Sequence, residues 1–591
     1  MAHYYVTKRN GEKVSFDPMR IKKAVEKAWI AADYPAESDQ FERVNEDIIN
    51  EVHTIFSDSA IGVEDIQDVV EKNLVNHGLY DISKRYILYR EKRAKIRDEK
   101  KKTVAEKAEQ GLLRIRKKSG ELMPFDKEKV MRTLNRSAAD IAISIDFQLI
   151  YQEFIKNIYD EITTSELEKL LLLSTAAFIE RDPQLSFVAS RLLIQRIYKR
   201  VILTSVDGDN FKFEARKAFI RGIQRGVEDK MYDERLLHFD LNFLAAKLDF
   251  SNDALFKYIG VQTLYERYLV KIQEQLIETP QAFWMRVAMG LAILEEDRDE
   301  KALEFYNLMS SLSFIPSTPT LFHSGLSHPQ LSSCYLSIVN DDLTHIFKVI
   351  GDNAQLSKWS GGIGNDWTRV RATNAHISST NVQSQGVVPF LKIANDTTVA
   401  INRSGKRRGA TCAYLETWHL DIEEFLDLRR NTGDDRRRTH DMNTANWIPD
   451  LFMQRVENSQ PWTLFSPDET PDLHDLYGKA FNSRYEHYEG EAAAGRKKLF
   501  KKVDAVALWR KMLTRLFETG HPWITFKDPC NIRSPQKHVG VIHNSNLCTE
   551  ITLNNSTDET AVCNLGSLNL SRHIQNNTLH QERLAATIKT A

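Results

Sequence analysis

A pattern that occurs twice, with the same spacing throughout, is the strongest constraint on the fold of the N-terminal third of the chain. The first copy reads K-R-N-G-E from Lys8 and F-D-P-M-R-I from Phe16, and the second reads K-K-S-G-E from Lys117 and F-D-K-E-K-V from Phe125. Each copy predicts a short strand, a turn containing Gly, a second short strand and a helix that begins after Asp. The repeat therefore indicates two copies of one folding unit.

Basic segments with apolar periodicity, at residues 83–95 and 190–202, predict the last helix of each copy. The highly charged linker at residues 95–107 predicts a solvated helix between the copies. A basic hairpin is by itself equally compatible with a solvated surface. Its duplication beside a helix start favours a ligand site, because basic side chains and free N–H groups at a helix N-terminus suit a polyphosphate.

The sequence changes character after the repeats. Residues 205–310 predict mostly helices, for example at 263–278 and 280–296, and contain no chemical motif. From about residue 314, short apolar runs alternate with helical stretches and Gly-rich turns, as at 333–339, 361–372 and 410–415. Such alternation predicts an α/β unit with a largely parallel sheet.

Composition and charge exclude several classes of protein. With 80 basic and 81 acidic residues, the chain offers no electrostatic reason to bind nucleic acid or an anionic membrane. Its first residues are too polar for a secretory signal, and no apolar run approaches the roughly 20 residues that span a bilayer. We therefore expect a cytoplasmic protein.

Five cysteines occur, at positions 334, 412, 530, 548 and 563. They form no C-x-x-C pair and have no paired histidines nearby, so neither a disulfide scaffold nor a metal site is predicted, and a simple thiol oxidoreductase is disfavoured. The default interpretation of each is a small buried apolar residue. Only local context can overturn that interpretation.

One cysteine has such a context. Asn546, Cys548 and Glu550 are spaced i, i+2, i+4, so they point to one side of an extended segment. In a helix the same side chains would spread over about 200°. An amide, a thiol and a carboxylate can therefore meet one small ligand if the segment is extended. An ordinary edge strand with a polar face is the alternative.

Cys334 and Cys563 lie in flanks that suggest extended structure, but they are far apart in the sequence. A disulfide requires Cα atoms within about 7 Å of each other. Only the fold could bring the two cysteines together, and the pattern alone does not show that it does.

The cysteine motifs S-S-C-Y-L, S-N-L-C-T-E-I and A-V-C-N-L-G-S occur in the order and rough spacing of the large subunits of ribonucleotide reductases. The stretch G-G-I-G from Gly361, the run from Arg408 to His419 and F-S-P from Phe465 fit the same family. The chain thus resembles the large, catalytic subunit of class I ribonucleoside-diphosphate reductases, and its repeats resemble the ATP-cone. The fold implied is two mainly helical ATP-cones (1–95 and 108–202), a helical region (205–310) and the first part of a ten-stranded α/β barrel (311–591).

The resemblance implies chemical roles. Cys548 would form a thiyl radical and take the 3′-hydrogen of the ribose, while Glu550 accepts the 3′-hydroxyl proton and Asn546 holds the ribose hydroxyls. Cys334 would protonate the departing 2′-hydroxyl and, with Cys563, supply two electrons by closing to a disulfide that thiol exchange must reset. The other two cysteines, Cys412 and Cys530, match no motif and are expected to be structural.

Binding residues are implied in the same way. For substrate phosphates, the positions that match the family are Thr318, in the loop 316–319, and Ser333. For a specificity effector they are Asp341, Lys358, Arg371 and, in the mobile loop 405–410, Arg407. For ATP in the first cone they are Lys8, Arg9 and Arg20, with the counterparts Lys117, Lys118 and Lys129 in the second cone.

The resemblance also implies ligands and partners. These are ATP, dATP and dNTP effectors with Mg²⁺, a separate metal-containing small subunit that supplies the radical, a reductant of the thioredoxin or glutaredoxin type and self-association. No covalently bound cofactor is expected. Because the family continues past Ala591, we expect either a fragment or one product of a split gene, with a second chain completing the barrel. Half a barrel exposes sheet edge and core, so the isolated chain is expected to be inactive and poorly soluble.

Alternative functions remain open at this stage. A nucleotide-sensing regulator could also carry ATP-cones, but such proteins add a zinc ribbon, and no paired C-x-x-C occurs here. A reductase of another radical class, dependent on cobalamin or on a glycyl radical, is the second alternative. The paired cones and the match across residues 361–419 favour the aerobic type.

Overall fold

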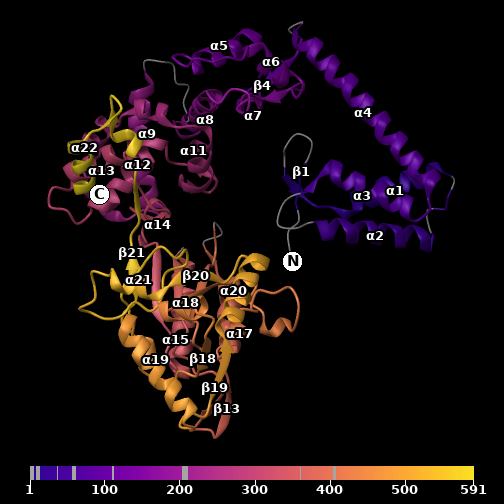
Figure 1. The fold of residues 1–591 in the computed structure, drawn as a ribbon. Helices are drawn as coiled ribbons and strands as arrows, with labels where there is room; N and C mark the ends of the chain where they lie inside the picture. The colour runs from indigo at the N-terminus through magenta and orange to yellow at the C-terminus, as the bar shows by residue number, and fades with distance from the viewer. Residues whose placement is uncertain are drawn as a thin grey trace. The chain divides into compact units, whose positions relative to one another are not determined.

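The computed structural model describes residues 5–7, 13–32, 34–35, 38–55, 61–109, 112–202, 210–359, 361–403 and 407–591. Lys8 and Arg9, expected to contact phosphate in the first cone, and Lys406 in the loop 405–410 lie outside these ranges. The chain forms two compact units (Figure 1): Met1–Arg196 with Phe256–Gln262, and Ile197–Leu255 with Thr263–Ala591.

The first unit contains the predicted repeat. In each copy an antiparallel hairpin is joined by a third strand that runs parallel to its first strand (β1, β2 and β3; β4, β5 and β6). Asp17 and Asp126 cap the following helices by accepting hydrogen bonds from Met19 N and Lys129 N, as expected of aspartate at this position. The elements are β1 Tyr5–Thr7, β2 Lys13–Ser15, α1 Pro18–Ala31, α2 Asp39–Ile55, β3 Ile61–Gly62, α3 Val63–Asn76, α4 Tyr80–Glu109, β4 Arg114–Arg116, β5 Leu122–Pro124, α5 Lys127–Ser137, α6 Phe147–Ile155, β6 Ile162–Thr163, α7 Thr164–Ala176 and α8 Leu185–Ile202.

The charged linker is helical, as predicted, because α4 runs without a break for 30 residues, from Tyr80 to Glu109. The helix predicted at residues 190–202 lies within α8. Both predictions rested on charge and apolar periodicity, and both are confirmed.

The prediction of a helix at residues 263–278 is wrong beyond Tyr268. After α11 Tyr258–Thr263 and one π-helical turn, η4 Leu264–Tyr268, the chain forms the hairpin β7 Lys271–Ile272 and β8 Gln275–Leu276. Gln273 and Glu274 adopt positive φ angles, which a helix does not contain. The apolar periodicity is instead used to bury Ile272 and Leu276.

The prediction of a second helix nearby is confirmed by α12 Pro280–Ala292, which is capped by Thr279. The other helices of this region are α9 Phe211–Glu228, η2 Glu234–His238, α10 Leu241–Ala246, η3 Phe250–Leu255 and α13 Arg298–Ser310. None of the described helices is long and apolar enough to cross a membrane.

A six-stranded sheet forms the centre of the second unit, in the order β20-β17-β16-β11-β10-β21. Its strands are β10 Cys334–Ile338, β11 Gly362–Asp366, β16 Thr411–Glu416, β17 Asn443–Ile448, β20 Trp523–Phe526 and β21 Ala561–Cys563. All neighbours are parallel except β21, which runs antiparallel to β10. Every residue of β11 and β16 is buried, as expected of parallel strands covered on both faces. The predicted α/β unit with a largely parallel sheet is confirmed.

A large apolar core lies between this sheet and its helices and includes Trp367, Trp418 and Trp462. The remaining helices and hairpins connect and cover the sheet. They are β9 Phe314–Pro316, α14 Thr318–His323, α15 Leu343–Lys358, β12 Thr373–Ile377, β13 Val382–Gln385, α16 Val388–Ala400, β14 Asn402–Arg403, β15 Arg407–Arg408, α17 Ile422–Phe425, η5 Asp435–Arg437, α18 Asp450–Glu457, β18 Pro461–Phe465, η6 Leu473–Asp475, α19 Gly478–Ala493, β19 Phe500–Asp504, α20 Ala505–Thr519, α21 Lys527–Ile532, β22 Gly566–Leu568, η7 Leu570–His573, β23 Ile574–Gln575, β24 Thr578–Leu579 and α22 Gln581–Thr590.

A buried ion pair fixes the hairpin β7–β8 against α12. Arg286 Nε lies 2.7 Å from Glu278 Oε1, and both side chains are almost fully buried. The second oxygen, Glu278 Oε2, accepts a hydrogen bond from Val270 N, and Arg286 also donates to Ser324 O. These contacts satisfy the charged groups inside the unit.

Replacing Arg286 by Met is expected to lower the free energy of unfolding of this unit by about 3–5 kcal/mol, because Glu278 would remain buried without its counter-charge. Urea unfolding followed by circular dichroism measures the change. Lys348→Met is the control, since its ion pair with Asp352 is exposed, and it should leave the unfolding midpoint nearly unchanged. Equal midpoints for the two variants would contradict the prediction.

Candidate active site

Cys334 and Cys563 face each other across the antiparallel strands β10 and β21. Directly opposed residues of such a pair have Cα atoms about 4.5–5.5 Å apart, which lies within the range of disulfides. The fold thus brings together two cysteines that are far apart in the sequence. Both side chains are buried, and the thiols interact with each other.

The segment 546–550 is not extended, which corrects the sequence-based prediction. Leu547 and Cys548 form a turn, and Thr549 has a positive φ of 67°. The cause is the Asn546 side chain, because its Oδ1 accepts hydrogen bonds from the backbone N–H groups of Glu550 and Ile551. An asparagine that hydrogen-bonds to the backbone after it favours a turn over a strand.

The turn nevertheless brings the predicted side chains to one place. Asn546 Nδ2 donates a hydrogen bond to Cys334 Sγ at 3.0 Å, and Glu550 Oε1 lies 4.0 Å from the same sulfur. Asn546 is fully buried, whereas Cys548 and Glu550 are exposed. Two of the three groups therefore converge on the cysteine pair directly.

Burial raises the pKa of the Cys412 thiol in β16, and Cys548 adds a small contribution in the same direction. Two residues beyond Cys412, the Tyr414 hydroxyl donates a 2.6 Å hydrogen bond to Asn546 O. Cys412 is fully buried in an apolar cluster with Tyr414 and Leu547. The structural role of Cys412 and Cys530 stays a prediction.

The thiols of the opposed pair are held in the protonated form. Burial, assisted by Cys563, raises the pKa of Cys334 to about 12, while the hydrogen bond from Asn546 acts in the opposite direction. Burial likewise raises the pKa of Cys563. At neutral pH both groups therefore carry a proton that can be donated.

The loop expected to meet substrate phosphates lies beside this pair. Ser333 Oγ and Ser317 Oγ are 2.6 Å apart, and Ser333 N donates to Cys563 O. Thr318 Oγ1 is hydrogen-bonded to the Tyr268 hydroxyl at 2.9 Å. Strand β22, which follows Cys563, pairs with β9, which leads into the loop. The predicted loop 316–319 is only partly a loop, because Pro316 ends β9 and Thr318 begins α14, and the fold places this segment and Ser333 next to the cysteines.

The residues expected to bind a specificity effector lie after β10, after β11, at the end of α15 and in β15. Asp341 follows β10, and its Oδ2 lies 2.7 Å from Nε of Arg371, which follows β11. Lys358 closes α15, with its ammonium over the ring of Trp359. Arg407 belongs to β15, which pairs with β14, so part of the predicted loop is a hairpin. The structure joins Asp341 and Arg371 in an ion pair.

In the first cone Arg20 lines a cavity of about 160 Å³ between the hairpin, α1 and α3, together with Phe16 and Asp17. The Arg20 side chain is 75% exposed, with its Nε 3.4 Å from Asp17 Oδ2. In the second cone Lys117 forms an ion pair with Glu121. The phosphate-binding role of these residues stays a prediction.

Several residues that shape the site were missed from the sequence. Tyr268, Gly364 and Tyr414 contact its segments. Tyr268 comes from a segment with no motif, whereas Gly364 and Tyr414 lie in stretches that matched the family without any role being predicted for them. Tyr414 alternates with Cys412 in T-C-A-Y-L-E, so a strand assignment would have placed both on one face. Gly364 belongs to the G-G-I-G stretch, but only the packed structure shows that the backbone of Ser545 and Asn546 crosses it.

Three protein-family models match the chain. "Ribonucleotide reductase, barrel domain" matches residues 332–591, and "Ribonucleotide reductase, all-alpha domain" matches residues 254–329. "ATP cone domain" matches residues 4–95 and 113–200. The chain belongs to the ribonucleotide reductase family. The predicted order, helical ATP-cones followed by an α/β barrel domain, is confirmed.

Curated relatives agree with the family. The "Ribonucleoside-diphosphate reductase subunit alpha" of Chlamydia muridarum is 49% identical over 596 residues, which cover 99% of this chain and 57% of that protein. The subunit of the same name from Helicobacter pylori is 39% identical over 446 residues, covering 75% and 55%. The "Ribonucleoside-diphosphate reductase large subunit" of Arabidopsis thaliana is 37% identical over 451 residues, covering 74% and 53%. The chain spans a little over half the length of these relatives.

Gly364 of β11 is the position where the Asn546 segment crosses the sheet. A Cβ atom added there would lie 2.0 Å from Ser545 O and 2.8 Å from Asn546 Cα, far inside van der Waals contact. Gly364→Ala is therefore expected to displace the segment and to cost about 1–3 kcal/mol of stability. Urea unfolding measures the stability, and amide exchange of the peptide that contains Asn546 measures the displacement.

Gly351→Ala is the matched control. Gly351 lies within α15 with nothing within 4 Å of the added Cβ, so alanine should be neutral or stabilise the protein by roughly 0.5–1 kcal/mol. A Gly364→Ala variant as stable as Gly351→Ala would show that the segment does not rest on β11.

Proposed function

We propose that this chain carries the reacting residues of a ribonucleoside-diphosphate reductase, which converts ribonucleoside diphosphates to 2′-deoxyribonucleoside diphosphates. The observation that carries the proposal is the opposed pair Cys334 and Cys563, with Asn546 and Glu550 both at the Cys334 sulfur. Family membership supports it. The fold alone would not, since one fold serves many activities.

Each group has a chemical task in this proposal. Cys548, as a thiyl radical, takes the 3′-hydrogen of the ribose and returns it at the end of the cycle. Glu550 accepts the 3′-hydroxyl proton, for which an exposed carboxylate next to the turn is suited. Asn546 orients the ribose hydroxyls. Because Cys334 is protonated at neutral pH, it can donate its proton to the 2′-hydroxyl, which leaves as water.

The cysteine pair supplies the electrons for the reduction. The carbon that loses the hydroxyl gains a hydrogen, and the two electrons come from Cys334 and Cys563 as their sulfurs form a disulfide. A dithiol reductant of the thioredoxin or glutaredoxin type then restores both thiols by exchange. Substrate phosphates lie against Ser333 and the loop containing Thr318.

Control by nucleotides belongs to the same proposal. Residues 1–95 and 108–202 form the ATP-cones that take ATP or dATP with Mg²⁺, through Lys8, Arg9 and Arg20 in the first cone. Asp341, Lys358, Arg371 and Arg407 form the dNTP specificity site, so the Asp341–Arg371 ion pair must open for an effector phosphate to reach the guanidinium. A small metal-containing subunit supplies the radical, and the enzyme works as an oligomer in the cytoplasm. Residues 205–310 form the helical region, and residues 311–591 supply barrel strands.

The cysteine pair can be tested in the isolated chain without turnover. Mild oxidation with diamide is expected to form one disulfide, between Cys334 and Cys563, because their Cα atoms already lie at disulfide distance. Mass spectrometry of peptides digested without reduction identifies the link. Cys334→Ser and Cys563→Ser should each abolish it, whereas Cys530→Ser should not. Failure of the pair to form, in a chain that is folded by circular dichroism, would contradict the arrangement.

The radical role of Cys548 is tested in the assembled reductase. Cys548→Ala is expected to lower deoxynucleotide formation by at least about 10³-fold, because no other group at the turn can take the 3′-hydrogen. Binding of ATP, measured by equilibrium dialysis, should be unchanged. Cys530→Ala is the control and should retain activity. Turnover by Cys548→Ala near the level of the unmodified enzyme would refute the assignment.

A further inference from the structure

Four charged side chains lie together, almost fully buried, behind the candidate site. His474 donates from both ring nitrogens, Nε2 to Asp366 Oδ2 at 2.6 Å and Nδ1 to Glu416 Oε1 at 2.5 Å. Lys527 Nζ lies 2.7 Å from the same Glu416 oxygen. An imidazole donates from both nitrogens only when it is protonated. The group therefore holds two positive and two negative charges and is neutral overall.

The direction of the pKa shifts agrees with a protonated His474. Burial opposes a charge on His474, but the Asp366 carboxylate and the hydrogen bonds to both carboxylates raise the pKa of His474 above its ordinary value. Burial by itself would raise the pKa of Asp366, and the charge on His474 holds it low. His474 thus stays an imidazolium near neutral pH.

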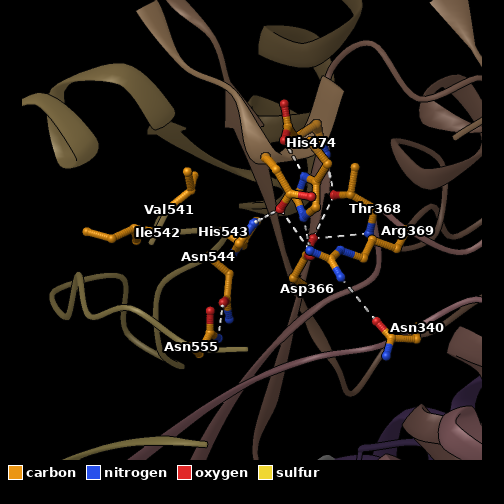
Figure 2. A network of polar contacts seen from close by, with 12 residues as sticks. Asn340, Asp366, Thr368, Arg369, His474, Val541, Ile542, His543, Asn544 and Asn555 are labelled. Carbon is orange, nitrogen blue, oxygen red and sulfur yellow. Dashed lines mark hydrogen bonds and ion pairs between the residues drawn. The ribbon is translucent and has the colours of Figure 1, made fainter. Parts of the chain in front are cut away.

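A second histidine, His543, lies against this cluster (Figure 2), with its ring centroid 4.5 Å from that of His474. His543 Nε2 lies 2.7 Å from Asp475 Oδ1, which Arg369 also contacts at 2.8 Å. His543 Nδ1 is buried and has no hydrogen-bond partner. A neutral imidazole that donates from Nε2 satisfies this arrangement, whereas an imidazolium would face His474 with a second positive charge.

His543 begins the segment that carries the reacting groups. Asn546 follows three residues later, Cys548 five residues later and Glu550 seven residues later. Before His543, Ile542 is held through both of its backbone groups by the Asn531 side chain. After it, Asn544 accepts a hydrogen bond from Asn555, as Figure 2 shows. The contacts of Ile542 and Asn544 are therefore between neutral groups, whereas His543 packs against the charged cluster.

We propose that His543 is a positioning residue for the segment that carries Asn546, Cys548 and Glu550, and that this segment loosens when His543 takes up a proton. The cause is repulsion by the fixed charge of His474, which the buried cluster cannot release. The positioning proposal rests on the proposed function for its catalytic meaning, but the loosening itself does not. It adds a protonation-dependent anchor to the site.

The charged groups around His543 decide whether its pKa is raised or lowered. Burial, then the charge on His474, lowers the pKa of His543, and Lys527 acts in the same direction. The hydrogen bond to Asp475 and the charge on Asp366 act in the opposite direction and do not prevail. Since the pKa in the folded protein lies below the ordinary value, the unfolded chain binds the proton first as the pH falls. The anchoring is present above the ordinary histidine pKa and is lost as the pH falls through the lowered one.

The test is amide hydrogen exchange of the full chain, read in peptides that cover residues 541–551, between about pH 5 and pH 8. The N–H groups of Glu550 and Ile551 report on the segment, because both are bonded to Asn546 Oδ1. The unmodified chain is compared with His543→Gln at each pH, so the intrinsic pH dependence of exchange cancels. Gln keeps a donor for Asp475 and cannot take up a proton.

We expect equal exchange of the two proteins at pH 8 and an excess of at least about threefold in the unmodified chain at pH 5. His538→Gln is the matched control, since His538 is exposed on the same stretch, and it should behave as the unmodified chain at every pH. A ratio that stays near one across the range would overturn the proposal. The readout needs no turnover, so a failure here is distinct from a failure of the reductase assignment.

If His543→Gln does not fold, as judged by circular dichroism, Asp475→Ala is used instead. Removing the carboxylate that His543 contacts is expected to make the peptides that cover residues 541–551 exchange faster than those of the unmodified chain at pH 8. Unchanged exchange in Asp475→Ala would overturn the positioning role.

Discussion

The candidate site depends on β11, a strand that is buried along its whole length and flanked by β10 and β16. At Gly364 it has no side chain, and the backbone of Ser545 and Asn546 occupies that space. Two residues later its Asp366 carboxylate holds His474. Between them Asn365 is hydrogen-bonded to Asn353 and Ser337, which ties α15 and β10 to the same strand. A change at β11 therefore affects the segment that carries Asn546, Cys548 and Glu550, the strand that carries Cys334, and the buried charges together.

The buried charged groups of this unit are tolerated because each lies next to groups of opposite charge. The cluster of Asp366, Glu416, His474 and Lys527 is neutral, and so is the pair Glu278 and Arg286 in the helical region. Breaking such a group leaves an unpaired charge without water, which costs several kcal/mol. The same balance leaves little room for another charge, which is why protonation of His543 beside His474 would disturb its surroundings.

Much of the fold followed from local patterns. The duplicated hairpin and Asp-capped helix, the helical linker and the parallel sheet could be predicted, because turn residues, caps and apolar periodicity act within a few residues. The helix predicted at 263–278 failed because apolar periodicity does not distinguish a helix from a π-turn followed by a hairpin when tertiary contacts, here to Glu278, satisfy the backbone. The prediction of an extended segment at Asn546 was wrong for a related reason. The Asn546 side chain accepts hydrogen bonds from two backbone N–H groups, which in a strand would have bonded to a neighbouring strand.

The sequence by itself determined which residues are candidates for the chemistry: the three cysteine motifs, the amide and the carboxylate near Cys548, and the duplicated basic turns. Their types and spacing are local properties, so they can be read without a fold. Only the tertiary structure decided that Cys334 and Cys563 meet, that Asn546 and Glu550 reach the Cys334 sulfur from a turn, and that two histidines from distant segments share one charge environment. Contacts between distant segments depend on how the sheet brings strands into register, and burial then sets which protonation state each group can hold.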